Sequence, residues 1–135
     1  MKFPHLILRI AMYLLSLVMI VFGIQHFLHP HELVNYVPQF LPGGIIWVYF
    51  AGVAFILVAI AFIANRMVKA AGYILAVILF IFVLTMHIPN FLNAGDKDMK
   101  QMALISILKD TAIASFALYI AAGAHHQKLH MDESD

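Results

Sequence analysis

Residues 102–114 read MALISILKDTAIA, an apolar run that is interrupted by the adjacent charges of Lys109 and Asp110. With its flanks, the run is long enough to cross a bilayer, which takes about 20 predominantly apolar residues. An ion in hydrocarbon costs at least about 2.5–3.5 kcal/mol, so it is retained only where it is paired or faces a polar interior. The stretch therefore predicts a membrane-spanning helix that carries part of a buried polar site.

The composition of the whole chain also indicates a membrane protein. Hydrophobic residues make up 64% of its 135 residues and charged residues 11%, whereas charged residues are about 25% of a soluble domain. The net charge of +1 gives no reason to expect a nucleic-acid partner. Cysteine is absent, which excludes disulfides, thiolate catalysis and iron–sulfur ligation by this chain.

Four apolar stretches have the length of a membrane span. The predicted fold is an all-α membrane protein, a four-transmembrane-helix antiparallel bundle that forms one domain over residues 1–135. Its spans are expected at residues 6–27, 45–64, 68–87 and 99–122. Pro89 is expected to stop the third helix and Gly123 to cap the fourth. No small-residue cleavage site follows the first stretch, which we therefore interpret as a retained helix and not as a signal peptide.

The distribution of lysine and arginine predicts how the spans are oriented. The first loop, residues 29–42, has neither residue. Of the eight lysines and arginines in the chain, five fall at the N-terminus, in the second loop and in the C-terminal tail: Lys2, Arg9, Arg66, Lys69 and Lys128. We therefore expect a multi-pass protein of the cell inner membrane with both termini in the cytoplasm and the first and third loops outside.

The first outer loop is expected to contain a short helix. Pro30 suits the first position of a helix, and Leu33, Val34 and Val37 follow at helical spacing. This pattern predicts a short amphipathic helix lying in the membrane interface. A connector that dips into the headgroups is the alternative.

Polar residues gather at the outer ends of three predicted helices. Lys109 and Asp110 lie about 10 residues, or ~15 Å, into the fourth helix. The predicted ligand-binding residues are Gln25, His26, His29, His87, Asn90, Lys109 and Asp110. In the alternative interpretation Lys109 extends toward the headgroups, Asp110 pairs locally and His87 only satisfies loop carbonyls.

Four short segments resemble the DoxX family of small four-helix membrane proteins. They are residues 23–30 (GIQHFLHP), 38–42 (PQFLP), 49–52 (YFAG) and 108–112 (LKDTA). The resemblance implies a four-span antiparallel bundle. It also implies an association with respiratory or thiosulfate–quinone oxidoreductase subunits, redox-stress complexes or receptor-assembly chaperones. Many members carry an acidic residue one turn after the glycine of the second helix, where this chain has Phe55 after Gly52. A mechanism that uses that carboxylate therefore does not carry over.

Two functions follow from these features. One is a redox-associated subunit that binds a quinone-like or other amphipathic ligand near the outer face, with membrane or periplasmic redox proteins as partners. The other is a non-enzymatic membrane scaffold or assembly factor. Haem held by His26 and His87 is disfavoured because both lie at helix ends, and no metal site is predicted. Alanines of the fourth helix suit close contact within the bundle or between the protomers of a homo-oligomer.

Overall fold

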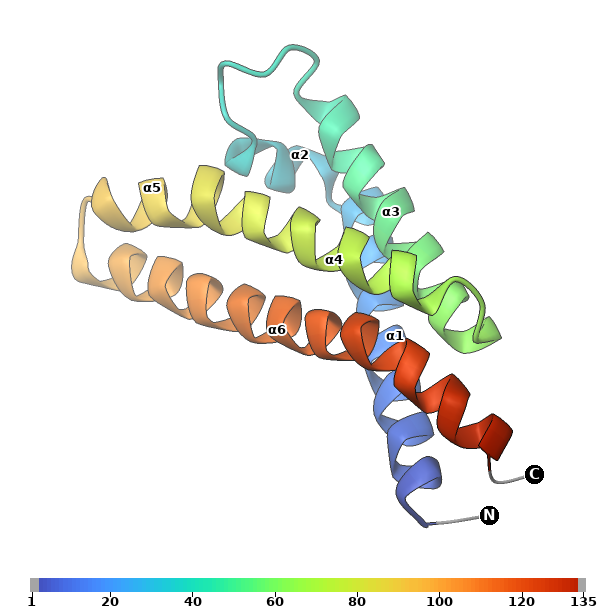
Figure 1. The fold of residues 1–135 in the computed structure, drawn as a ribbon. Coiled ribbons are helices and arrows are strands. Elements are labelled where there is room, and N and C mark those ends of the chain that lie inside the picture. Colours follow the sequence, from blue (N-terminus) through green and yellow to red (C-terminus); the bar gives the residue numbers. More distant parts are fainter. Residues whose placement is uncertain (1–2, 134–135) are drawn as a thin grey trace. The chain divides into compact units, whose positions relative to one another are not determined.

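The structure is a computed structural model that describes the backbone of residues 3–133 and the side chains of residues 3–124. Lys2 and the side chain of Lys128, which contribute to the predicted orientation, lie outside the described residues. The described chain is all-helical (Figure 1). Its elements are α1 (Phe3–Leu28), α2 (Pro30–Leu33), the 3-10 turn η1 (Val34–Tyr36), α3 (Ile45–Ala64), α4 (Val68–Phe82), the π-turn η2 (Val83–His87), α5 (Ile88–Leu92) and α6 (Lys97–Glu133).

Four helical stretches are long and apolar enough to cross a membrane, which confirms the predicted fold class. They are Phe3–Leu28, Ile45–Ala64, Val68–Leu92 and Lys97–Ala124. The protein is thus an all-helical, multi-pass membrane protein, consistent with a four-helix bundle. The second span has its predicted bounds because a left-handed residue, Asn65 at φ 54°, ends α3. Asparagine tolerates that backbone conformation better than most residues do.

The third helix does not stop before Pro89, which differs from the prediction. It passes through η2, in which the N–H of Ile88 bonds to the carbonyl of Val83, and continues as α5 to Leu92. A proline lacks the N–H that an α-helix would use at that point. The wider π-turn changes the register of the hydrogen bonds around this missing donor, so the helix continues.

The fourth helix begins slightly earlier and ends later than predicted. The Asp96 carboxylate accepts a hydrogen bond from the backbone N–H of Met99 at 2.7 Å and so caps the first turn of α6. Gly123 does not end the helix, which continues to Glu133. A single glycine costs a helix only about 1 kcal/mol relative to alanine. The prediction of a cap at Gly123 was therefore wrong.

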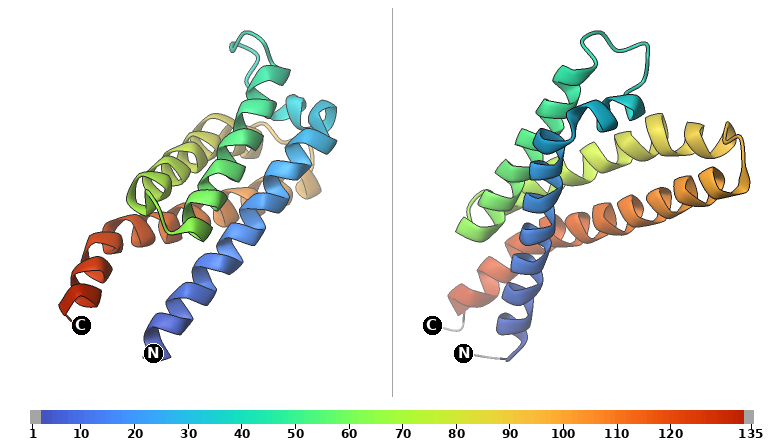
Figure 2. Two further views of the ribbon diagram at one scale, coloured as in Figure 1. Left: turned by 90° about the vertical axis from the view of Figure 1, so that its right-hand side faces the viewer. Right: turned by 180° about the vertical axis from the view of Figure 1, so that it is seen from behind.

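The chain divides into two compact units, with the boundary between Ala71 and Gly72. The first unit contains the hairpin of α1 and α3, which run side by side (Figure 2). A Cβ added at Gly23 would lie 2.9 Å from the carbonyl oxygen of Gly52, and one added at Gly52 would lie 3.1 Å from the carbonyl oxygen of Gly23. The two backbones therefore meet where neither residue has a side chain. The loop between them contains α2 and η1, which confirms the predicted short helix in the first loop.

The second unit is the hairpin formed by α4, η2 and α5 with α6. It also has a close backbone contact, because a Cβ added at Gly72 would lie 2.8 Å from both the carbonyl oxygen of Ala117 and the Cβ of Ala121. Ala117 and Ala121 are buried. These two alanines of the fourth helix thus contribute to contact inside the hairpin.

Candidate functional site

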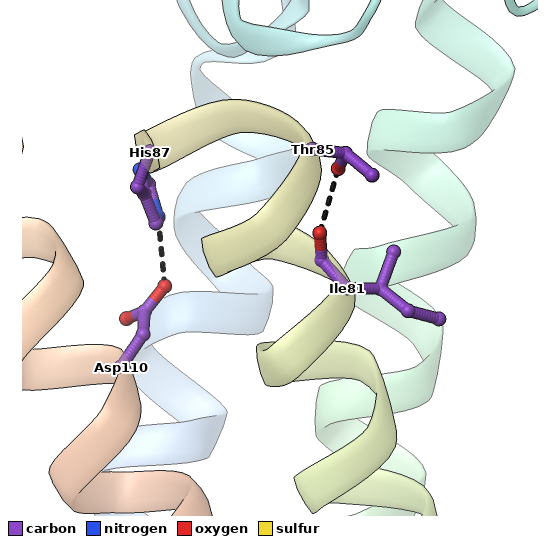
Figure 3. Close-up of polar contacts among 4 residues, drawn as sticks. All are labelled: Ile81, Thr85, His87 and Asp110. Carbon is purple, nitrogen blue, oxygen red and sulfur yellow. Dashed lines mark hydrogen bonds and ion pairs between the residues drawn. The ribbon is translucent and has the colours of Figure 1, made fainter. Parts of the chain in front are cut away.

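The clearest polar contact between elements of the second unit joins His87 and Asp110. The Nε2 atom of His87 and the Oδ2 atom of Asp110 lie 2.8 Å apart, and the side chains are only 14% and 15% exposed (Figure 3). His87 ends η2, and Asp110 lies well inside α6. About 20 Å of helix rise separates Asp110 from the start of α6, so the carboxylate is near the middle of the span.

The direction of side chains on a helix explains how the two residues meet. About 7 Å of helix rise separates His87 from the end of α5 at Leu92, whereas about 20 Å separates Asp110 from the start of α6 at Lys97. Asp110 is therefore deeper in the hairpin than His87. Side chains on a helix lean toward its N-terminus. His87 thus leans deeper into the span while Asp110 leans toward the turn, and the two side chains close the gap.

His87 lies at the end of the π-turn, where the hydrogen-bond pattern of the helix changes. The hydroxyl of Thr85 donates to the carbonyl of Ile81 at 2.7 Å, which satisfies a backbone group next to the turn (Figure 3). π-turns of this kind occur frequently at functional sites.

The pair can be neutral overall in two ways. Either an imidazolium faces a carboxylate, or a neutral ring accepts a hydrogen bond from the carboxylic acid. In both forms Nδ1 of His87 carries a hydrogen, because Nε2 is engaged with Oδ2 of Asp110. The site therefore offers Nδ1–H as a donor and the second carboxyl oxygen, Oδ1, to another polar molecule.

His26 lies in the first unit, near the end of α1. Its Nδ1 donates to the carbonyl of Phe22 at 2.6 Å, and its ring stands edge-on to Phe55 with centroids 5.3 Å apart. A Cβ added at Gly52 would lie 2.9 Å from the Cβ of His26. The helix contact therefore holds the imidazole against Phe55, the residue that stands where the resembled family carries an acid.

The other four predicted site residues are exposed. Nδ1 of His29 lies 3.6 Å from Glu32, one turn later, and both side chains are exposed. Gln25, Asn90 and Lys109 are exposed. Lys109 has no ion pair within the described part of the chain, so Asp110 is matched by His87 and not by its neighbour.

The structure thus joins His87 with Asp110 within the second unit, and within the first unit it places His26 against Phe55. That all seven residues face one common site stays a prediction. Among residues 3–124, no three histidine or acidic side chains are placed to hold a metal ion. Sequence reasoning named both members of the pair but missed the π-turn. The feature of the sequence that could have indicated the π-turn is Pro89, which lies within an apolar run that continues to Leu92.

Comparison with known proteins places the chain in one family. A family model described as a domain of unknown function (DUF8561) matches residues 15–121, which include every predicted site residue. No curated protein and no solved structure matches the chain. Because the model covers most of the chain, this protein belongs to the DUF8561 family.

Proposed function

We propose that this member of the DUF8561 family binds the polar head of a quinone-like or other amphipathic ligand through His87 and Asp110. The observation that carries the proposal is their 2.8 Å contact inside a membrane-spanning hairpin, at a π-turn. The role would be that of a redox-associated membrane subunit that binds the ligand without catalysing a reaction by itself. The resemblance to the DoxX family supports the same role.

The available atoms of the pair suit this chemistry. The Nδ1–H of His87 can donate to the carbonyl oxygen of an oxidised quinone ring, and Oδ1 of Asp110 can accept from the hydroxyl of the reduced form. Ligand sites in helical membrane proteins need few polar groups when an apolar surround holds the rest of the molecule. The apolar residues of the spans supply that surround.

The proposed location is the inner membrane, with both termini in the cytoplasm. This orientation rests on the lack of lysine and arginine in residues 29–42 and on their presence at the N-terminus and in the second loop. In that orientation α1 leaves the membrane and α6 enters it on the outer side. His26, His87 and Asp110 would then lie in the outer halves of their spans.

Ligand retention tests the proposal. The tagged full chain is purified from native membranes, and its lipid extract is compared by mass spectrometry with that of His87→Ala and Asp110→Asn. Loss of a hydrogen bond to a charged group costs about 1.5–3 kcal/mol, so we expect at least about tenfold less co-purified quinone or other amphipathic molecule. Thr85→Val is the matched control because the hydroxyl of Thr85 bonds to the carbonyl of Ile81 in its own helix and not to the pair.

The proposal is wrong if the wild-type protein carries no such molecule above the level of its bulk lipid. It is equally wrong if both pair variants retain as much as Thr85→Val does. An absorbance spectrum of the same preparations tests haem independently of the extract. The non-enzymatic scaffold is a second candidate function, favoured by the exposed position of Lys109 in the fourth span.

A further inference from the structure

The third span meets α6 along a line that a straight α-helix would not follow. Near the start of this span, Gly72 lies against Ala117 and Ala121 of α6, where a Cβ added to the glycine would lie 2.8 Å from an atom of each. Eighteen residues of an α-helix make about five whole turns, so Asn90 would face α6 in the same direction as Gly72. Asn90 is instead exposed. The direction in which the helix presents its side chains therefore changes between these two residues.

Two contacts beyond Gly72 show the direction of this change. Nε2 of His87 lies 2.8 Å from Oδ2 of Asp110. Further along, the ammonium of Lys100 lies 4.9 Å from the ring centroid of Phe91. In a straight α-helix that starts with Gly72 facing α6, His87 would point about 60° and Phe91 about 100° away from α6. Both residues nevertheless reach side chains of α6.

The π-turn η2 explains why they do. In this turn the N–H of Ile88 bonds to the carbonyl of Val83, five residues back, so the turn holds one residue more than a turn of α-helix does. Each residue after the turn is therefore set back by about 100°, into the direction that its predecessor would have. Phe91 takes the direction of Asn90, toward α6, and His87, at the end of the turn, also swings back toward α6.

Pro89 disfavours the alternative, α-helical register. In a straight α-helix the N–H of residue 89 would bond to the carbonyl of Thr85. A proline has no N–H, and its ring clashes with the carbonyl four residues back. Pro89 follows the turn directly, as the second residue of α5. A wider turn changes which carbonyl faces the ring, so the proline favours the π-turn over the α-helical register.

We propose that Pro89 is a positioning residue of the site formed by His87 and Asp110. By excluding the α-helical register, it holds the end of the third span in the rotation that brings His87 to Asp110. The role of this pair in binding a ligand rests on the function proposed above, whereas the rotation of the helix does not. Measurements without a ligand therefore test the positioning role separately from ligand binding.

A double-mutant cycle of unfolding in bicelles, with His87→Ala and Asp110→Ala, measures the contact in each background. With the natural Pro89 we expect a coupling of about threefold to thirtyfold in the folding equilibrium constant, the range found between membrane helices. Pro89→Ala should reduce this coupling to about onefold, whereas a merely structural proline would change the stability and leave the coupling as it is. Leu92→Ala, at an exposed position of the same short helix, is the matched control and should keep the coupling.

Deletion of Leu84 supplies a compensating change. Leu84 lies within the π-turn, and removing one residue there allows a straight α-helix in which every later residue keeps the direction that it has now. In the Pro89→Ala background this deletion should therefore restore the coupling between His87 and Asp110. A Pro89→Ala variant that keeps the full coupling, or a deletion that restores none of it, would overturn the proposal.

Crosslinking in native membranes measures the rotation directly, also for a variant that does not survive purification. The natural chain has no cysteine, so Lys100→Cys can be combined with Phe91→Cys or with Asn90→Cys and joined by a short thiol-reactive crosslinker. With Pro89 present, the combination with Phe91→Cys should react at least about tenfold faster than the one with Asn90→Cys. Pro89→Ala should reverse this preference. An unchanged preference for position 91 would contradict the positioning role.

Discussion

At the scale of single residues, Asp110 shows how a membrane constrains an ionisable side chain. In water it could remain solvated, but within a span it needs a partner. Its sequence neighbour Lys109 points elsewhere on the helix, since consecutive residues of an α-helix are about 100° apart. His87, from the other arm of the hairpin, is the partner that the structure provides at 2.8 Å.

This pairing predicts a coupled effect on stability. His87→Ala and Asp110→Ala should each lower the free energy of unfolding, and the double variant should lose less than the sum of the two. We expect a coupling free energy of about 0.6–2 kcal/mol, the range found for hydrogen bonds between membrane helices. The measurement is a double-mutant cycle of unfolding in detergent or bicelles. Strictly additive losses would show that the contact contributes nothing to stability.

At the scale of elements, glycine decides how closely α1 and α3 pack. Gly23 and Gly52 each approach the carbonyl oxygen of the other, and a Cβ at Gly23 would also lie 2.5 Å from Cγ1 of Ile56. Membrane helices gain little from apolar burial against one another, so close backbone approach is a main source of their association. The same contact fixes His26 against Phe55.

Gly23→Ala should therefore destabilise the first hairpin. The added methyl group meets both a side chain and the backbone, and overpacking of this kind costs about 1–3 kcal/mol. Gly123→Ala is the matched control, because a Cβ there meets nothing within 4 Å and alanine favours a helix by about 0.5–1 kcal/mol. Thermal unfolding should show a lower midpoint for Gly23→Ala only. Equal midpoints would mean that the close contact is not required.

At the scale of the whole molecule, the distribution of charge predicts which side of the membrane each loop occupies. The second span has no ionisable side chain of Asp, Glu, Lys, Arg or His, so it carries no orientation signal of its own. The orientation depends on the flanking loops, where lysine and arginine favour the cytoplasm.

Labelling of introduced cysteines checks this orientation. The natural chain has no cysteine, so each single-cysteine variant reports on one position. Gly95→Cys, at a position with nothing within 4 Å of an added Cβ, should react with a membrane-impermeant maleimide in intact spheroplasts. Ser134→Cys should react only after the membrane is opened. The reverse pattern would invert the proposed orientation.

The sequence alone determined the number of spans, the bounds of the second span and the short helix of the first loop. These features depend on local composition, since about 20 apolar residues, a turn residue or a proline act within their own segment. The sequence also singled out His87 and Asp110 as polar residues in an apolar setting. Only the tertiary structure decided that these two bond to each other, that the helix passes Pro89 through a π-turn, and that Gly23 meets Gly52. Such contacts depend on how one helix is rotated and how deeply it lies against its neighbour. Residues that are far apart in the chain determine this packing jointly.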